Sequence, residues 1–297
     1  MTPRILVIGR TGQVARALAE RRAGRSLTLL GREALDLTDL DAIGPAVASA
    51  APDVVINAAA YTAVDRAESE RDLAERINGH AVGSLAEAAA AVGAALVHLS
   101  TDYVYPGTGT TPYQESDPTG PVNAYGETKL LGEHLARGAN PHTVILRTSW
   151  VYAPWGKNFV ATMLRLSDRE RLTIVADQVG QPTSAEDIAD ACLTVADRVA
   201  EAQGPAPFGV YHLAGRGQTS WAGFAAAVFS EAKALGLIER SPEVFPIPTS
   251  AYPTPAARPA NSRLDCSRIE AVFGHRSRPW RTALRATLER MRQDSVA

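Results

Sequence analysis

The sequence predicts an α/β protein, with a doubly wound parallel sheet first and a smaller, discontinuous part second. Short apolar runs alternate with alanine-rich amphipathic stretches through the first half of the chain, and this alternation is typical of βαβ units with parallel strands. The pattern loosens after Trp150, and 297 residues are enough for one large domain plus a smaller one.

Five strands alternate with four helices in the first half. The predicted strands cover residues 5–8, 27–30, 54–56, 96–99 and 144–146, and the predicted helices cover residues 13–22, 40–50, 71–92 and 125–137. The helical stretches are rich in Ala, Leu, Arg and Glu, which are strong helix formers. Right-handed crossovers are expected between the parallel strands.

The second half contains fewer and less regular elements. Strands are predicted at residues 172–175 and 210–213, and helices at residues 159–167, 188–200, 222–235 and 282–292. The proline-rich residues 245–259 are predicted to form a rigid loop within a domain, because helix-forming sequence continues beyond them. We expect one domain from residues 1–150 and 187–214, and a smaller one from residues 151–186 and 215–297.

Composition bounds the partners and the location. A net charge of −2, with 45% hydrophobic and 21% charged residues, gives no electrostatic reason to expect a nucleic acid or membrane partner. No stretch approaches the ~20 apolar residues of a membrane span, and the first apolar run meets Gly9 at once, as a strand does and a targeting segment does not. Cys192 and Cys266 follow no metal or disulfide pattern, so we predict a reducing, cytoplasmic location. The six histidines are interpreted as surface or packing residues.

A glycine loop follows the first predicted strand. It reads Gly-Arg-Thr-Gly-Gln-Val-Ala over residues 9–15, with Thr11 between the two glycines, and it opens a helix. Small residues at Gly9, Gly12 and Ala15 let the backbone approach a pyrophosphate, which the N–H groups at the helix start would bind. The loop therefore predicts a Rossmann-like dinucleotide-binding domain. The alternative is a tight turn without a ligand.

The ends of the second and third strands indicate which dinucleotide is bound. Arg32 stands where NAD-preferring enzymes carry an acidic residue for the ribose 2′-hydroxyl, and its charge suits a 2′-phosphate. NADPH is the predicted cofactor, and NADH stays open because Arg32 also fits a solvated loop charge. Asp36 and Leu37 are placed to contact the adenine. Three small residues after the third strand leave room for a cofactor against the strand ends. They are Ala58, Ala59 and Ala60.

A hydroxyl, a carboxyl, a phenol and an ammonium follow the fourth strand. Thr101 and Asp102 come at the strand end, and Tyr125 and Lys129 are four residues apart on one face of the next predicted helix. Reduction of a ketone needs a hydride at carbon and a proton at oxygen, and a free tyrosine with a pKa of about 10 is a weak acid. We expect Lys129 to lower the pKa of Tyr125, the proton donor, and Thr101 to hydrogen-bond the carbonyl oxygen. Asp102 is expected to orient a substrate hydroxyl.

Lysine is scarce, which makes the Tyr-x-x-x-Lys pair more informative. Only three of the 30 basic residues are lysines, and with eight tyrosines chance gives about 0.08 such pairs in 297 residues. A lysine kept in an arginine-rich chain indicates a need for a compact ammonium with an adjustable pKa. The alternative is that Tyr125 packs in the core and Lys129 is a solvated helix charge. The set predicts a nicotinamide-dependent ketone reductase of the short-chain, extended type.

At these residues the chain resembles the dTDP-4-dehydrorhamnose reductases, in segments that run almost from end to end. The segments are residues 9–14, 57–68, 100–105, 125–133, 147–152, 158–159, 177–183 and 258–264. The Thr-Ala-Val-Asp-x-Ala-Glu and Asp-Gln-x-Gly-x-Pro-Thr stretches among them are more specific than the Tyr-x-x-x-Lys pair. The resemblance implies hydride transfer from NAD(P)H to the 4-keto group of dTDP-4-dehydro-6-deoxy-L-mannose, which gives dTDP-L-rhamnose.

The resemblance also implies roles for individual residues. By motif position Tyr125 is the acid/base and Thr101 tunes it. The residues expected to face the sugar nucleotide are Thr101, Asp102, Tyr103, Trp150, Asn158 and Arg258. The residues expected to line the cofactor are Gly12, Gln13, Val14, Asp36, Leu37, Ala60, Tyr61, Thr62, Leu99 and Lys129.

Two departures from the family pattern concern packing and metal binding. Ala15 stands where many relatives have glycine, which tightens helix–strand packing without excluding a dinucleotide. Some relatives form a magnesium-bridged dimer through glutamates, one of them just after the glycine loop, where this chain has Arg16 and Ala17. We therefore predict no metal site, and both a monomer and a homodimer stay open.

Three other functions stay open. The first is reduction of a different nucleotide-linked 4-keto-6-deoxysugar. The second is a non-catalytic NADP-binding regulatory subunit, since the β subunit of methionine adenosyltransferase is similar to this family; the Thr101, Tyr125 and Lys129 set argues against it. The third is an epimerase or dehydratase of the same extended fold, which ranks below a reductase because no glutamate follows Asp102.

Overall fold

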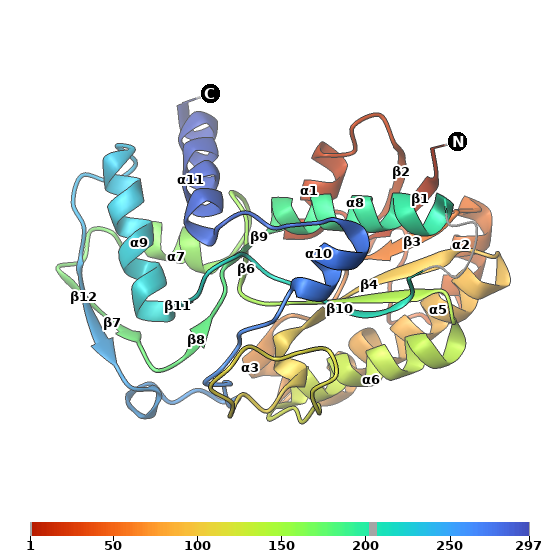
Figure 1. Ribbon diagram of the computed structural model, residues 1–297, viewed down its shortest axis with the longest axis horizontal. Coiled ribbons are helices and arrows are strands. Elements are labelled where there is room, and N and C mark those ends of the chain that lie inside the picture. The colour runs from red at the N-terminus through yellow and green to blue at the C-terminus, as the bar shows by residue number, and fades with distance from the viewer. Residues whose placement is uncertain (1, 202–206, 297) are drawn as a thin grey trace.

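A six-stranded parallel sheet forms the centre of the larger part of the molecule (Figure 1). The computed structural model describes residues 2–201 and 207–296. The strand order is β10-β5-β4-β3-β1-β2. These strands are β1 (Arg4–Ile8), β2 (Ser26–Leu30), β3 (Val54–Asn57), β4 (Ala95–Thr101), β5 (Thr143–Thr148) and β10 (Gly209–Leu213). The predicted doubly wound parallel sheet is confirmed, and each of its six strands lies within three residues of its predicted bounds at either end.

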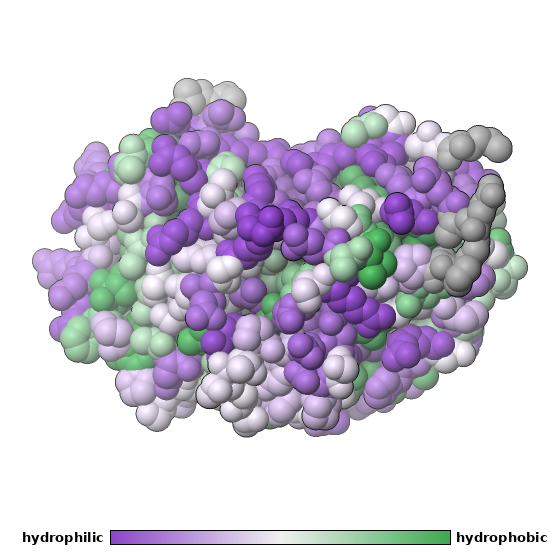
Figure 2. Space-filling model, in the orientation of Figure 1, coloured by the Kyte–Doolittle hydropathy of each residue, from purple (hydrophilic) through white to green (hydrophobic). Residues whose placement is uncertain are grey.

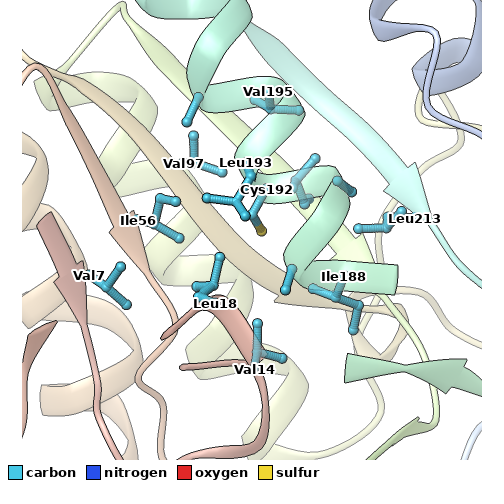
Figure 3. Close-up of a cluster of buried hydrophobic side chains, with 14 of the residues drawn as sticks. Val7, Val14, Leu18, Ile56, Val97, Ile188, Cys192, Leu193, Val195 and Leu213 are labelled. Carbon is cyan, nitrogen blue, oxygen red and sulfur yellow. The ribbon is translucent and has the colours of Figure 1, made fainter. Parts of the chain in front are cut away.

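Helices cover both faces of this sheet, because successive side chains of a buried parallel strand point to opposite faces. On one face lie α1 (Gln13–Glu20), α8 (Ala185–Glu201) and α10 (Ser267–Phe273). On the other lie α2 (Ile43–Ala50), α5 (Ala81–Ala91) and α6 (Ala124–Ala139). Figure 3 shows the first face, where Val14 and Leu18 of α1 and Ile188 and Cys192 of α8 meet Val7 of β1 and Ile56 of β3.

The chain reverses its winding between β1 and β3. From β1 it moves outward to the edge strand β2, and then returns past β1 to β3 and on toward β10. The loops after β1 and β3 therefore diverge at the carboxyl edge of the sheet, which is where doubly wound proteins bind their ligands. This switch point places the glycine loop beside Ala58 and Ala59.

The predicted helix at residues 71–92 is interrupted. It consists of α4 (Arg71–Glu75), a π-helical turn η1 (Arg76–His80) and α5, and π turns inside helices occur often at functional sites. The helix α6 crosses this turn closely: a Cβ added at Gly132 would lie 2.0 Å from the carbonyl oxygen of Asn78. Glycine at 132 thus lets α6, which carries Tyr125 and Lys129, sit close to η1.

The smaller part is built on its own apolar cluster. The helices α7 (Phe159–Arg165), α9 (Trp221–Ala234) and α11 (Trp280–Val296) pack around Tyr152, Phe224 and Trp280. Two strands, β7 (Arg171–Val175) and β12 (Glu243–Ile247), pair in parallel beside them (Figure 1). The remaining elements are β6 (Val151–Tyr152), β8 (Val179–Gly180), β9 (Thr183–Ser184), β11 (Thr219–Ser220), α3 (Val64–Ala67), η2 (Asp102–Val104) and η3 (Thr249–Ala251).

The prediction of a loop over residues 245–259 is wrong at its start. Residues 243–247 form β12, although Pro246 lies inside it. Proline has no N–H to donate, so it is tolerated in a strand whose outer side has no partner, and β12 belongs to a two-stranded sheet. The sequence does not show how many strands neighbour a segment. Pro246 was therefore interpreted as evidence against a strand.

One face of the molecule is shown with its hydropathy in Figure 2. Figure 2 shows a mostly hydrophilic face, with hydrophobic colour confined to small patches. Within residues 2–201 and 207–296, no helix combines the length and the hydropathy needed to cross a membrane.

Candidate functional site

The glycine loop forms a cradle at the start of α1. Gly9 adopts φ = +113°, a conformation that side chains disfavour, and its N–H donates to the carbonyl of Leu30 at 2.8 Å. A Cβ at Gly9 would already touch Ala58 and Ala59, at 3.5 Å. Gly12 is the N-cap of α1, with no side-chain cap and no acidic residue in the first turn. The helix start therefore keeps its N–H groups and its positive dipole end for an anion such as a pyrophosphate.

The residues that follow in α1 reach this cradle in different ways. The side chain of Val14 is buried in the core, so only its main chain can face a ligand. Gln13 is held by the smaller part of the molecule, because its carbonyl accepts from Trp155 Nε1 at 3.2 Å and its Oε1 from Asn158 Nδ2 at 3.1 Å. Thr11 is exposed. The glycine loop is thus braced from both parts of the chain.

The predicted 2′-phosphate site is electrostatically mixed. The Arg32 side chain is 81% exposed, and its Nε lies 3.2 Å from Asp36 Oδ2. Hydrogen bonds from Thr38 and the Arg32 guanidinium lower the pKa of Asp36, so that its carboxylate is ionised and already engaged. A further acidic residue, Glu33, lies near the end of β2, and its carboxylate pairs with Arg10 at 2.9 Å. That Arg32 contacts a 2′-phosphate stays a prediction.

The loop after β3 is fixed by two buried asparagines. Ala59 N donates to Asn57 Oδ1 at 3.1 Å, and Tyr61 N donates to Asn78 Oδ1 at 2.9 Å. Asn78 comes from the π turn η1 and also binds Thr128 of α6. The loop residues expected at the cofactor therefore have a main chain set by side chains. They are Ala58, Ala59, Ala60, Tyr61 and Thr62, of which Thr62 is exposed and the others half-buried.

Thr101 and Tyr125 meet where β4 ends and α6 begins. Asn123 caps α6 by accepting from Gly126 N at 2.8 Å, which puts Tyr125 in the first turn. A Cβ at Gly126 would lie 2.2 Å from the carbonyl oxygen of Tyr103, so glycine is needed for this close approach. The rings of Tyr103 and Tyr125 pack edge to face, with centroids 5.5 Å apart. The Thr101 hydroxyl hydrogen-bonds the Tyr125 phenol.

Burial dominates the electrostatics of this group. It raises the pKa of Tyr125 to about 12, against the lowering effect of the Thr101 hydroxyl. It also raises the pKa of Asp102 to about 7, because hydrogen bonds from Ser262 and Thr101 offset only part of the desolvation. Within the described residues, Asp102 Oδ2 is buried without a hydrogen-bond partner. The carboxyl is therefore poised to titrate near neutral pH.

Lys129 is 1% exposed and lies on the face of α6 that carries Tyr125. Its Nζ donates to the carbonyl of Leu99 at 2.7 Å and lies 3.2 Å from His98 Nε2. Burial lowers the pKa of Lys129 to about 8, against the raising effect of Glu133. The expectation that Lys129 lowers the pKa of Tyr125 stays a prediction: in the free protein burial dominates the pKa of the phenol, and Lys129 Nζ donates to Leu99 of β4.

Tyr103 and Arg258, both expected at the substrate, lie near the phenol from another direction. Arg258 Nη2 pairs with Asp65 Oδ1 at 2.8 Å, and Asp65 also accepts from Ala256 N. Burial raises the pKa of Tyr103, which also feels the charges of Asp102 and Arg258. A segment from the end of the chain thus reaches the site at the switch point.

Trp150 and Asn158 behave differently from each other. Trp150 has φ = +47° and stacks on Trp221, with ring centroids 3.6 Å apart. No side chain fits at Gly180, where a Cβ would lie 2.4 Å from the Trp150 ring. Asn158 caps α7 by accepting from Ala161 N and donates to Gln13, so a direct contact between Asn158 and a substrate stays a prediction.

Several residues at the site were assigned no role from the sequence, although Asn57 and Ser262 lie in segments that resemble the family. They are Asn57, Asn78, His98, Trp221 and Ser262. His98 was interpreted as a surface or packing residue, and it is fully buried against Lys129. No spacing rule links these residues, because each contact depends on the register of neighbouring strands or on the fold of the smaller part.

The position expected to replace a metal ligand has its own packing. Arg16 lies over the ring of Trp155, 4.5 Å from its centroid, and Arg290 lies at the same distance from that ring. Arg290 also pairs with Glu20 and Glu186. Across the described ranges, no group of three or more His, Cys, Asp or Glu side chains is arranged to hold a metal ion.

The fold and the site define the class of protein. A glycine cradle at the switch point of a doubly wound sheet, with a Tyr-x-x-x-Lys pair on the helix after β4, is the arrangement of a Rossmann-type short-chain dehydrogenase/reductase. Comparison with known proteins narrows this class. The family model described as "RmlD substrate binding domain" matches residues 3–293.

Individual relatives agree with the family model. A dTDP-4-dehydrorhamnose reductase of Sinorhizobium fredii is 46% identical over 284 residues, which are 95% of each chain. The crystal structure of a dTDP-4-dehydrorhamnose reductase from Clostridium acetobutylicum has a TM-score of 0.90 at 36% identity, and covers 97% of this chain and 99% of that one. The enzyme from Bacillus anthracis, in complex with NADP, has a TM-score of 0.88 at 33% identity with the same coverage. The chain belongs to the dTDP-4-dehydrorhamnose reductase family.

Proposed function

We infer that this protein reduces the 4-keto group of dTDP-4-dehydro-L-rhamnose with NADPH or NADH, giving dTDP-L-rhamnose. The observation that supports this function most strongly is the match to dTDP-4-dehydrorhamnose reductases over nearly the whole chain. The buried Thr101 and Lys129 and the half-buried Tyr125 supply the chemistry that this reaction needs. Since the Bacillus anthracis relative binds NADP, we propose NADPH as the preferred cofactor.

The residues at the switch point fit a dinucleotide. The Gly9 and Gly12 cradle offers unpaired positive charge at the start of α1, and Arg32 offers an exposed guanidinium for a 2′-phosphate. Leu37, Leu99 and the loop after β3 would line the rest of the cofactor. When bound, the reduced nicotinamide supplies the hydride for the carbonyl carbon.

The residues of this chain then handle the carbonyl oxygen. Because burial raises the pKa of Tyr125 to about 12, the phenol is protonated at neutral pH, as a proton donor in the direction of reduction must be. Thr101 lies beside the phenol and donates its single hydroxyl hydrogen to Asp102 in the free protein; with substrate bound it would donate that hydrogen to the same oxygen instead. The charge of Lys129 would stabilise the phenolate left after the proton transfer. We propose that Asp102, Tyr103, Trp150 and Arg258 orient the sugar nucleotide.

Three wider expectations remain proposals. We propose that residues 1–150 and 187–214 bind the dinucleotide and residues 151–186 and 215–297 bind the sugar nucleotide; α10 lies in the second set but packs on β10 and α8. A cytoplasmic location is supported by Cys192 and Cys266, which are both free thiols. Both a monomer and a homodimer remain compatible with the fold.

The test is an assay of NADPH and NADH oxidation with dTDP-4-dehydrorhamnose generated in situ. We expect oxidation with at least one cofactor and the appearance of dTDP-L-rhamnose. Oxidation only with another nucleotide-linked 4-keto-6-deoxysugar would replace the proposed substrate. No oxidation with any such ketone, alongside normal NADP binding, would support a non-catalytic role instead.

The Tyr125→Phe variant tests the proton donor. We expect it to bind NADPH as the wild type does and to lose about 10²–10⁴-fold in turnover, because only the phenolic hydroxyl is removed. Tyr252→Phe is the matched control, since Tyr252 is 58% exposed. Near-normal turnover of Tyr125→Phe would refute the assignment.

A further inference from the structure

A series of three hydrogen bonds, two of them buried and one part-buried, lies behind Lys129 and has no part in the proposed reaction. It runs from Ala59 N to Asn57 Oδ1 at 3.1 Å, from Asn57 Nδ2 to His98 Nδ1 at 3.1 Å, and from His98 Nε2 to Lys129 Nζ at 3.2 Å. Asn57 and His98 are fully buried. The chain joins the helix α6 to the loop after β3 across two neighbouring strands.

The hydrogens in this chain can be placed from donor and acceptor rules. The N–H of Ala59 can only donate, so the oxygen of the Asn57 amide must face it, and the Asn57 NH₂ group is left to donate to His98 Nδ1. Burial and the nearby Lys129 hold the pKa of His98 well below its ordinary value, so the imidazole is neutral and carries one hydrogen. Since Nδ1 accepts, that hydrogen is on Nε2.

This arrangement has a consequence for Lys129. The Nε2–H of His98 points at Lys129 Nζ, which can accept a hydrogen bond only through the lone pair of an uncharged amine. The same amine still donates one hydrogen to the carbonyl of Leu99. An ammonium at Nζ would instead face another donor.

We propose that Asn57 and His98 are positioning residues that favour the uncharged form of Lys129 and tie its protonation to the turn at Asn57 and Ala59. When Nζ takes up one proton, the hydrogen of His98 must leave Nε2 and one must be gained at Nδ1. The imidazole stays neutral, so the net uptake is one proton. The Asn57 amide must then turn its oxygen toward Nδ1–H, and the N–H of Ala59 loses its acceptor.

The other groups around Lys129 act differently. Glu133, one turn further along α6, raises the pKa of Lys129, but its carboxylate is shared with Arg147 of β5. From η1 and α5, the side chains that pack on this stretch of α6 are Asn78, which binds Thr128, and Val82, which lies beside Gly132. Asp102, the first residue of η2 after β4, acts on Tyr125. The donor arrangement at His98 is therefore an influence on Lys129 distinct from these charges.

Only the catalytic consequence of this inference rests on the proposed function. In that function, the charge on Lys129 sets how readily Tyr125 gives up its proton. Through the hydrogen bonds of Asn57 and His98, the protonation of Lys129 would then depend on the conformation of the loop expected at the cofactor. The hydrogen-bond logic itself needs no ligand, so its test is done on the free protein.

The scarcity of lysine makes the test direct. Protein labelled with ¹³C at lysine Cε gives three signals, from Lys129 and from the exposed Lys157 and Lys233. Lys157→Arg and Lys233→Arg assign these signals. The pKa of Lys129 is then read from a pH titration by NMR, without cofactor or substrate, so that a wrong substrate assignment cannot affect the outcome.

Two substitutions should release the constraint. In His98→Gln the amide oxygen can accept from an ammonium without moving Asn57, and in Asn57→Ala the imidazole can carry its hydrogen on either nitrogen. We expect Lys129 to bind its proton about tenfold more tightly in each variant. Asn78→Ala is the matched control, because it removes a buried asparagine beside α6 that has no hydrogen bond to Ala59, Asn57, His98 or Lys129. It should leave the Lys129 titration unchanged.

Unchanged or weaker proton binding in both His98→Gln and Asn57→Ala would overturn the proposal. A second measurement needs no variant: ¹⁵N shifts of the His98 ring report its tautomer in the wild type. We expect Nδ1–H below the titration of Lys129 and Nε2–H above it. A tautomer that stays the same throughout the titration would also overturn the proposal.

Discussion

Two buried polar clusters lie one turn apart on α6, and they differ in how completely their members are paired. The paired cluster consists of Ser100, Tyr105, Glu133, Arg147 and His212. In it, Glu133 accepts three hydrogen bonds from Arg147, at 3.0, 3.2 and 2.6 Å, and one from Ser100. Arg147 in turn donates to Tyr105 at 2.6 Å. The ionised groups of this cluster are thus matched in charge and hydrogen bonding.

The reactive cluster consists of Thr101, Asp102, Tyr125 and Lys129, and its groups are not matched in this way. Among the residues that the structure describes, Asp102 Oδ2 has no hydrogen-bond partner, and the hydrogen-bond partners of Lys129 and Tyr125 are neutral. Burial therefore moves the pKa values of all three ionisable groups away from their ordinary values, to about 7, 8 and 12 for Asp102, Lys129 and Tyr125.

The difference shows where the fold leaves desolvation uncompensated. Except for the half-buried Tyr125, the side chains of both clusters are buried. Glu133 and Arg147 offset the desolvation cost of burial by pairing with each other, whereas no opposite charge offsets that cost for the reactive groups. Uncompensated burial gives groups that exchange protons near neutral pH, which is what proton transfer requires. The reactive cluster should therefore weaken the folded state under conditions where the paired cluster does not.

The largest expected effect comes from breaking the paired cluster. Arg147→Met leaves Glu133 as a buried carboxylate without its cation, and removal of one partner of a buried pair typically costs about 3–5 kcal/mol. We expect this loss in the free energy of unfolding, measured by urea denaturation at pH 7. Arg21→Met is the control, because the Arg21–Asp190 pair is exposed and should contribute less than about 1 kcal/mol. A similar small loss for Arg147→Met would remove the distinction between the clusters.

The sequence predicts the reactive cluster better than its surroundings. Tyr125 and Lys129 share a helix face because of their spacing, and Thr101 follows a strand that faces that helix. These relations are local in the chain or follow from the order of parallel strands. The same reasoning predicts the six strands of the main sheet, since each carries its own apolar run.

The partners that set the pKa values were beyond such reasoning. His98 meets Lys129 through the packing of α6 on β4, and Asn57 meets His98 through the register of β3 with β4. Ser262 reaches Asp102 from a distant part of the chain. A pairwise contact of this kind has no period or spacing in the sequence, so neither these partners nor the burial that raises the pKa of Tyr125 could be predicted.

The second prediction concerns Asp102 and pH. Between about pH 4 and pH 7 the folded protein keeps a proton on Asp102 that the unfolded chain has lost. As pH rises through this range, the free energy of unfolding of the wild type should therefore fall relative to that of Asp102→Asn, by about 4 kcal/mol in total. Chemical denaturation of both proteins at a series of pH values measures the difference. If the two curves stay parallel, Asp102 has an ordinary pKa, and the contrast with Glu133 fails at this residue.

The smallest of the three effects has the opposite dependence on pH, because Lys129 is a base. Between about pH 8 and pH 10.5 the unfolded chain holds a proton on this lysine that the folded protein has released. The wild type should therefore gain stability as pH rises through this window, relative to Lys129→Met, by about 3 kcal/mol in total. The difference between the two unfolding free energies isolates this residue, since the other alkaline titrations are common to both proteins. A constant difference would mean that Lys129 is matched after all, and a decrease would mean that Glu133 rather than burial controls its proton.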